Sequence, residues 1–224
     1  MGIIQIFSTG LGATEIFVLL TAWIIAITIA IVSHEYMHAW VAYKNGDYTA
    51  KAMGRLTLNP VKHFDAVGFL CLLLIGFGWA KPVPINENNF RNIKKGRIWV
   101  SLAGVLTNFV LAIIFTALWV LCFYFLDSTV LILKFITYLC LYTAFVNLFL
   151  GIFNLIPIYP LDGYNFIASF LPYNNKFCMF MRRYGTLLLF AVLIIFTYIP
   201  YGISDWVYWI FNQLANFFSW LYFI

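Results

Sequence analysis

The sequence predicts an all-α polytopic membrane protein with about five to six transmembrane helices. Of its 224 residues, 64% are hydrophobic and only 9% are charged, and the mean hydropathy is +0.93. These values exclude a soluble globular domain. The apolar residues gather into long runs that can cross a hydrocarbon core of about 30 Å. Because no long polar block separates the runs, residues 1–224 are expected to form a single domain.

Four runs are interpreted as membrane-spanning helices, because a crossing needs roughly 20 apolar residues. They are Ile16–Tyr43, Ile98–Leu126, Val130–Pro157 and Tyr184–Ile199. Two further segments are ambiguous. Ala66–Ala80 is short for a crossing, whereas Trp206–Ile224 is rich in aromatic residues, which favour the membrane interface. Either segment would bring the number of crossings above four.

Basic residues surround the ambiguous segment Ala66–Ala80 on both sides. Nine of the thirteen lysine and arginine residues lie between Lys44 and Arg97, and the net charge is +5. Since such residues concentrate in cytoplasmic loops, both flanks are expected on the cytoplasmic side of the plasma membrane. The segment is therefore predicted to be a short re-entrant or β-like element after the first helix. In this setting the positive charge favours contact with the lipid bilayer rather than with nucleic acid.

The first run contains His34-Glu35-Tyr36-Met37-His38, an HExxH motif near its C-terminal end. Residues four apart share one helix face, so His34 and His38 can bind one metal ion with Glu35 beside the open coordination position. Ionisable groups inside a membrane are costly and by default functional. Zinc lowers the pKa of a bound water towards about 7, and a neighbouring glutamate can act as general base. The motif predicts one Zn²⁺ per chain and hydrolysis with Glu35 as the catalytic residue, nearer the cytoplasmic side.

A third metal ligand is expected after the third run, where Pro157 and Pro160 interrupt the helix. Asp162 follows this break. Its carboxylate would complete a site of two histidines and one aspartate with one open position, an arrangement that suits catalytic zinc. The alternative is that Asp162 only supports a turn before Gly163, because Asp-Gly pairs are common in turns. Beside an intramembrane HExxH motif, the ligand role is favoured.

Taken in order, these motifs resemble those of the site-2 proteases, the intramembrane zinc metalloproteases of peptidase family M50. The similarity is to the compact bacterial type without PDZ or CBS domains, spans about residues 13–172, and includes residues 54–60 and 77–84. The resemblance implies cleavage of a single-span transmembrane protein, such as an anti-sigma factor or a signal-peptide remnant. Helices within about residues 173–224 would form a gate or an anchor. The residues that it implies as zinc ligands and catalytic base are His34, His38, Asp162 and Glu35.

Two asparagines match polar positions of the family pattern. Asn108 and Asn154 could donate hydrogen bonds to the developing oxyanion or orient a metal ligand. Ordinary hydrogen bonding between helices is an equal alternative. The chain departs from the pattern at Ala66 and Val105, which each stand where the family carries a proline. Neither departure removes an expected ligand.

The loop after the first helix holds two weaker candidates. His63 lies among basic residues, so a solvated histidine is expected rather than a metal ligand, with an orienting or substrate-gating role as the lesser alternative. Leu56, Thr57 and Leu58 are expected to be extended, and an edge strand there could pair with an unwound segment of substrate. A bend at Gly76-Phe77-Gly78 could serve the same purpose.

The main alternative function is a membrane metal transporter or a metal-binding membrane protein without catalysis. Either could place histidine and aspartate inside the membrane. Neither needs a carboxylate directly after the first histidine, so Glu35 favours hydrolysis. A transporter would also be expected to carry a second acidic cluster, and Glu15 and Asp127 are distant from the motif.

Overall fold

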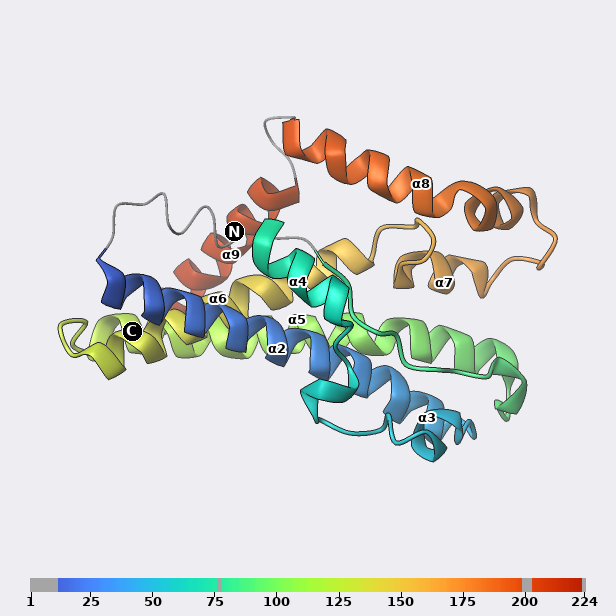
Figure 1. The fold of residues 1–224 in the computed structure, drawn as a ribbon, viewed down its shortest axis with the longest axis horizontal. Coiled ribbons are helices and arrows are strands. Elements are labelled where there is room, and N and C mark those ends of the chain that lie inside the picture. Colours follow the sequence, from blue (N-terminus) through green and yellow to red (C-terminus); the bar gives the residue numbers. More distant parts are fainter. Residues whose placement is uncertain (1–11, 76–77, 199–202, 223–224) are drawn as a thin grey trace.

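The computed structural model describes residues 12–75, 78–198 and 203–222 as helices joined by loops (Figure 1). Within these ranges no β-strand is present, and Phe64 and Ala80 form an isolated antiparallel bridge. The predicted all-α class is confirmed. The elements in chain order are α2 (Ala13–Lys44), α3 (Thr49–Ala52), the 3-10 turn η1 (Pro60–Lys62), α4 (Ala66–Ile75), the 3-10 turn η2 (Glu87–Asn89), α5 (Ile93–Phe125), α6 (Leu131–Asn154), α7 (Asp162–Ala168), α8 (Lys176–Tyr198) and α9 (Ile203–Tyr222).

Helices α2, α5, α6 and α8 are long and apolar enough to span a membrane. They correspond to the four predicted runs, but α2, α5 and α8 begin earlier than predicted and α6 ends at Asn154 rather than at Pro157. Helix α5 begins at Ile93 because Asn92 Oδ1 accepts a hydrogen bond from the backbone N–H of Lys95 at 2.9 Å. Helix α8 begins at Lys176 rather than at Tyr184. An apolar run marks the part of a helix that suits lipid. Helices α5 and α8 each begin before this run, in more polar sequence.

The chain segments before and after helix α4 lie next to each other. Its ten residues span about 15 Å, which is half of a hydrocarbon core of about 30 Å. Phe64 and Ala80 pair on either side of it, and the Lys81 N–H donates to the His63 carbonyl at 2.9 Å. The flanks therefore meet, as the prediction of a short re-entrant or β-like element requires. Residues 76–77 of the expected glycine bend lie outside the described ranges.

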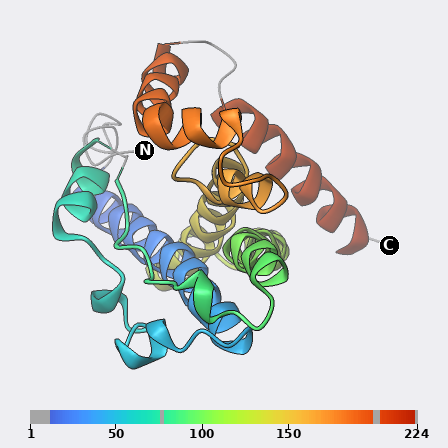
Figure 2. The same cartoon turned by 90° about the vertical axis from the view of Figure 1, so that its right-hand side faces the viewer.

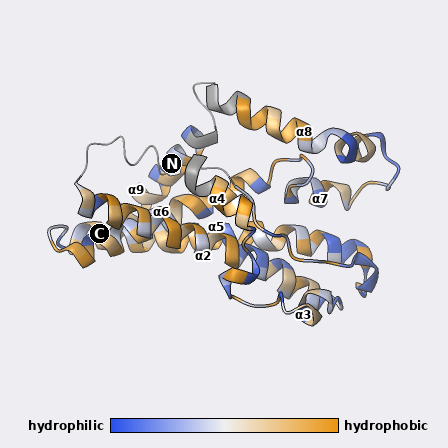
Figure 3. Cartoon of the chain, viewed as in Figure 1, coloured by the Kyte–Doolittle hydropathy of each residue, from blue (hydrophilic) through white to orange (hydrophobic). Residues whose placement is uncertain are grey.

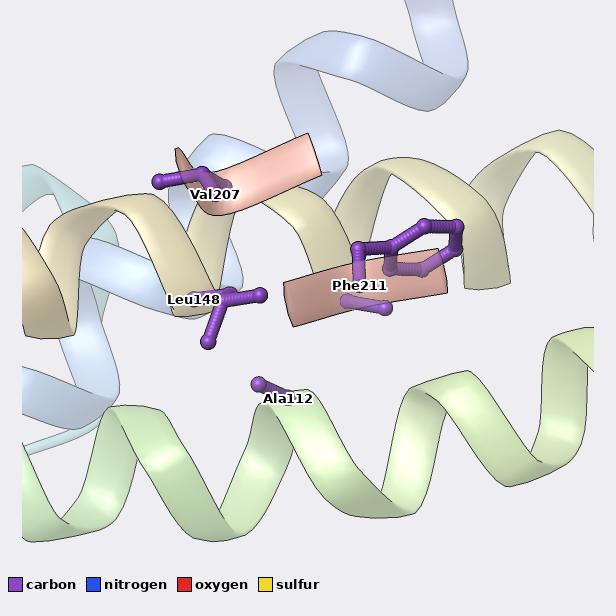
Figure 4. Close-up of a cluster of buried hydrophobic side chains, with 5 residues drawn as sticks. Ala112, Leu148, Val207 and Phe211 are labelled. Carbon is purple, nitrogen blue, oxygen red and sulfur yellow. The ribbon is translucent and has the colours of Figure 1, made fainter. Parts of the chain in front are cut away.

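Helix α9 packs one face against α5 and α6. Val207 and Phe211 of α9 meet Ala112 of α5 and Leu148 of α6 in a buried cluster (Figure 4). Across the described residues, four helices rather than five or six meet the length and hydropathy expected of a crossing, and α9 is not one of them. Its remaining surface is aromatic and exposed, with Trp206, Trp209 and Trp220.

The centre of the fold is formed by α2, α5 and α6, which pack on one another and lie side by side in both views (Figures 1 and 2). The end of α2, the start of α5 and α7 lie at the same end of the molecule, where hydrophilic residues gather (Figure 3). Since α2 ends at Lys44, the rise of a helix places His34 about 15 Å from that end. The HExxH motif therefore lies in the half of the helix that is nearer the polar end.

The break after α6 directs Asp162 back towards the bundle. Helix α6 ends at Asn154, and α7 begins at Asp162. At Gly163 a Cβ atom would lie only 2.2 Å from the carbonyl oxygen of Leu155. No larger residue could follow Asp162 without separating the two helix ends, which is the reason for the Asp-Gly sequence at this point.

Asp47 joins the end of α2 to the loop that contains η2. Its side chain is fully buried and accepts hydrogen bonds from the backbone N–H of Asn86 at 2.8 Å, from Asn89 Nδ2 at 2.8 Å and from the backbone N–H of Thr49 at 3.1 Å. Burial raises the pKa of Asp47, but the hydrogen bonds from Thr49, Asn89 and Asn86 outweigh burial and lower the pKa below its ordinary value of 3.8.

Asp47→Ala is expected to lower the free energy of unfolding at neutral pH by about 1.5–3 kcal/mol, the usual range for hydrogen bonds to a charged group. Because the pKa of Asp47 is lower in the folded state, the carboxylate contributes this stability above its unfolded-state pKa and loses it as the pH falls through the folded-state pKa. Thermal unfolding in detergent near neutral pH and near pH 2 tests both points. An equal difference between wild type and variant at the two pH values would contradict the assignment.

Candidate metal centre

His34, His38 and Asp162 converge on one point. The two histidines lie one turn apart on α2, and α7 supplies the carboxylate. Asp162 Oδ2 lies 3.2 Å from Nε2 of His34 and 3.2 Å from Nε2 of His38, and the two Nε2 atoms are 2.9 Å apart. Both histidines are buried. The predicted ligands are thus brought together, and in the part of the chain that the structure describes they form a group able to hold a metal ion.

The hydrogen bonds behind each imidazole determine which nitrogen faces this point with a lone pair. His38 Nδ1 lies 2.7 Å from the carbonyl oxygen of Val100, which can only accept, so Nδ1 carries the proton. His34 Nδ1 lies 2.6 Å from Asn108 Oδ1, which also can only accept. In the neutral imidazoles both Nε2 atoms are therefore unprotonated and present lone pairs to Asp162.

Three electron-pair donors that face one another need a cation between them. Among the described residues, no hydrogen bond reaches the buried Oδ2 atom of Asp162. Zinc bonds of about 2.0–2.1 Å in tetrahedral geometry would place ligand atoms about 3.3 Å apart, close to the observed 2.9–3.2 Å. Two neutral imidazoles and one carboxylate therefore fit zinc. The turn-only interpretation of Asp162 does not account for this orientation.

Gly104 lets α5 approach the histidine pair. A Cβ atom at this position would lie 2.5 Å from Cε1 and 2.6 Å from Nδ1 of His34, and 2.6 Å from Nε2 of His38. These distances are far below van der Waals contact, so only glycine fits. Gly104 directly precedes Val105, where the chain departs from the family pattern, but its role depends on which face of α5 meets α2.

Asn108 continues the site into a buried chain of amides. Its Nδ2 atom donates to Asn147 Oδ1 at 2.8 Å and to the Ala30 carbonyl at 3.3 Å, which leaves Oδ1 to face His34. Asn147 Nδ2 in turn donates to the Thr143 carbonyl at 2.8 Å. Asn108 therefore both orients a histidine and links helices. Sequence reasoning did not single out Asn147, although an asparagine inside an apolar helix is a signal of function.

Asn147→Leu is expected to weaken zinc binding about 10- to 100-fold, the usual effect of removing a group that orients a ligand. The Asn108 amide loses the partner that fixes its orientation, so His34 Nδ1 is no longer held. Competition with a chelator measures the affinity. Thr137→Val is the matched control, because the Thr137 hydroxyl donates to the Leu133 carbonyl within α6 at 3.0 Å. Equal affinities for both variants would contradict the prediction.

A cavity of about 290 Å³ opens beside the histidine pair and Asp162. Glu35 lines it, and its Oε2 atom accepts a hydrogen bond from the Val83 N–H at 2.9 Å. This contact fixes one carboxylate oxygen and leaves the other for a second partner. At the cavity wall Arg97 Nε lies 3.2 Å from Glu87 Oε2. The cavity thus combines three possible metal ligands, a further carboxylate fixed by a backbone N–H, and charged side chains of both signs.

The two predicted asparagines take different places. Asn154 lines the cavity and donates from Nδ2 to the Leu150 carbonyl at 3.0 Å. Asn108 is fully buried behind His34. Asn154 is therefore the one of the two that lines the cavity.

The predictions for the loop after α2 are wrong in two respects. His63 is fully buried rather than solvated, and its Nε2 donates to the Thr57 carbonyl at 2.7 Å. Leu56 and Thr57 form a bend instead of an extended strand, because Thr57 Oγ1 accepts from the Asn59 N–H at 3.2 Å and the chain then turns into η1. Leu58 is exposed, and the cavity is lined by other residues.

Comparison with known proteins agrees with this site. The model of peptidase family M50 matches residues 22–139 and 128–195. The protein named "Putative zinc metalloprotease YwhC" of Bacillus subtilis (strain 168) is 38% identical over 175 residues, which cover 77% of this chain and 79% of that protein. "Putative zinc metalloprotease Rip2" of Mycolicibacterium smegmatis is 27% identical over 212 residues, which cover 90% of this chain and 76% of that protein. No solved structure matches significantly.

The metal and the family follow from these findings together. Imidazole and carboxylate are ligands that zinc takes, and the relatives carry the name of zinc metalloproteases. The predicted Zn²⁺ cofactor is thereby confirmed. With its membrane-spanning helices and a family match that extends over most of its length, the chain belongs to peptidase family M50, the site-2 protease family.

Proposed function

We propose that this chain is an intramembrane zinc metalloendopeptidase that hydrolyses peptide bonds within or near the transmembrane segment of a single-span protein. One observation carries the proposal: Glu35 shares a cavity with three lone-pair donors, His34, His38 and Asp162, that converge within 3.2 Å of one another. A site that only stores or transports metal has no use for a carboxylate held beside the ligands.

In this proposal His34, His38 and Asp162 hold the metal. Bound zinc would polarise the attacking water and the scissile carbonyl. The Glu35 carboxylate takes a proton from the water as it attacks the carbonyl carbon, and later delivers it to the leaving nitrogen. Asn154, on the cavity wall, donates a hydrogen bond to the carbonyl oxygen as negative charge develops there.

The membrane defines the substrate and the side of attack. A transmembrane helix hides its carbonyl groups in hydrogen bonds, so a segment must unwind before Glu35 can act on it. The cavity includes residues from the start of α5, near the basic residues Lys94 and Lys95. Such residues favour the cytoplasmic side of the plasma membrane. The proposed substrates are therefore single-span proteins cut near the cytoplasmic face, such as an anti-sigma factor or a signal-peptide remnant.

The test uses purified protein in liposomes with a panel of single-span reporter substrates. We expect about one zinc per chain, cleavage that stops when a chelator removes the metal, and recovery when zinc is restored. Asp162→Ala should lose both metal and cleavage. Full zinc occupancy without cleavage of any reporter would favour a binding or transport role instead.

A further inference from the structure

Pro82 and Val83 line the cavity together with Glu35, and the backbone polar groups of the segment Lys81–Val83 form hydrogen bonds with three other residues. The Lys81 N–H donates to the His63 carbonyl at 2.9 Å. The carbonyl oxygens of Lys81 and Pro82 accept from Nη2 of Arg55 at 2.6 and 3.3 Å. The Val83 N–H donates to Glu35 Oε2 at 2.9 Å. One short extended piece thus connects a buried arginine and a buried histidine to the carboxylate in the cavity.

Arg55 is buried to an unusual degree for an arginine. Only 7% of the residue is exposed, and its contacts reach 26 and 27 positions along the chain. An arginine is almost never buried without partners, because removing a guanidinium from water is costly. Its partners here are the two main-chain carbonyls that precede Val83. A planar guanidinium that contacts two successive carbonyls restricts both the position and the direction of that backbone.

His63 holds the same segment from the other side. It is fully buried, its carbonyl accepts the Lys81 N–H, and its imidazole donates to the Thr57 carbonyl at 2.7 Å. The imidazole bond closes the turn between Thr57 and His63, two residues after Arg55. The segment is therefore fixed between two anchors that are themselves tied together through one short loop.

We propose that Arg55 and His63 are positioning residues for hydrolysis, which act by holding Lys81–Val83 so that the Val83 N–H fixes the carboxylate of Glu35. The proposal rests on the proposed function, because it assigns Glu35 the role of general base. Neither residue lines the cavity with the metal ligands, so their effect reaches the reaction only through the backbone. A shift of about 1 Å at a catalytic group can cost about 100-fold in rate.

The first test compares Arg55→Met with Arg55→Lys. Methionine keeps an apolar stem and removes the donors, whereas lysine keeps one cationic donor. We expect Arg55→Met to lower kcat for a cleaved reporter about 10- to 100-fold, with KM and zinc content unchanged, and Arg55→Lys to recover part of the loss. Lys62→Met is the matched control, since Lys62 is an exposed cation of the same loop, and it should behave as wild type.

His63→Gln and His63→Leu test the second anchor in the same way. Glutamine can still donate to the Thr57 carbonyl, whereas leucine cannot. We expect kcat close to wild type for His63→Gln and a loss of about 10-fold or more for His63→Leu.

Val83→Pro tests the contact itself, because proline has no N–H to donate to Glu35. Val83 precedes Pro84, so its backbone already favours the extended region that proline adopts. We expect this variant to reproduce the kcat loss of Arg55→Met. It also keeps the proposal testable if Arg55→Met fails to fold.

A double-mutant comparison decides between positioning and general damage. In a Glu35→Asp background, whose residual cleavage no longer depends on the Val83 contact, Arg55→Met should add little further loss. The proposal would be overturned if the kcat losses of Glu35→Asp and Arg55→Met multiplied in the double variant. It would also be overturned if the zinc content or the thermal stability of Arg55→Met fell in parallel with kcat. If wild type cleaves no reporter in a Glu35-dependent way, the proposed function itself fails; if wild type cleaves and Arg55→Met cleaves equally well, only the positioning role fails.

Discussion

Glu35→Gln is expected to abolish peptide hydrolysis while the metal stays bound. The three proposed ligands are His34, His38 and Asp162, and none is changed. Glutamine keeps the shape of the side chain but cannot take a proton from water. General acid and base catalysis contributes about 10²- to 10⁴-fold, so the loss should reach at least this range. Metal analysis and cleavage of a reporter, measured on the same preparation, test both halves of the prediction.

Glu15→Gln provides the matched control for this experiment. Glu15 lies in the first turn of the same helix and pairs with Lys134 of α6, far from the motif. It should retain cleavage and zinc. If Glu35→Gln cleaved at the wild-type rate, Glu35 would not be the base. If it lost zinc as well as cleavage, the separation of ligands from base that the cavity geometry suggests would be incorrect.

The same variant separates hydrolysis from metal transport. A transporter that uses the two histidines and Asp162 as a transit site should keep its metal flux when Glu35 becomes an uncharged isostere. A protease should lose its only assayable activity. The outcome therefore depends on chemistry and not on the metal content, which both functions share.

The long helices and the three side chains that could hold a metal ion were predictable because both depend on local sequence. A long apolar run indicates a segment that lies in lipid, and two histidines four residues apart on a helix lie on the same face. Asp162 was predictable because two prolines and a glycine mark the break that precedes α7. Helix ends were less predictable, since α5 starts at Ile93, directly after the cap residue Asn92, and not where the sequence becomes apolar.

What the sequence could not provide were the contacts between helices. The Val100 carbonyl, Gly104 and Asn147 act on the histidines because of the way α5 and α6 meet α2, and no local pattern encodes that register. His63 was misjudged for the same reason: a polar, basic loop suggests solvation, but tertiary folding buries the residue completely. The strand predicted at Leu56–Leu58 was replaced by a bend because of a hydrogen bond to a threonine hydroxyl.

Gly104→Ala is the second change from which a large effect is expected. The added Cβ would lie 2.5–2.6 Å from ring atoms of both His34 and His38, so at least one imidazole must move. Orienting groups around a metal are usually worth about 10- to 100-fold in affinity. Because this substitution displaces the ligands themselves, zinc affinity should fall by the upper end of that range or more, and cleavage should fall with it.

In a helix, alanine is more favourable than glycine by about 1 kcal/mol, so the substitution should not destabilise α5 itself. Loss of zinc could not then be attributed to a weaker α5. Gly151→Ala is the matched control, since the three atoms nearest to a Cβ there belong to the ring of Phe109, at 3.0–3.3 Å, and chelator competition should give the wild-type zinc affinity. If Gly104→Ala also bound zinc as wild type does, α5 could not lie against the histidine pair, and the packing that builds the metal centre would have to be reconsidered.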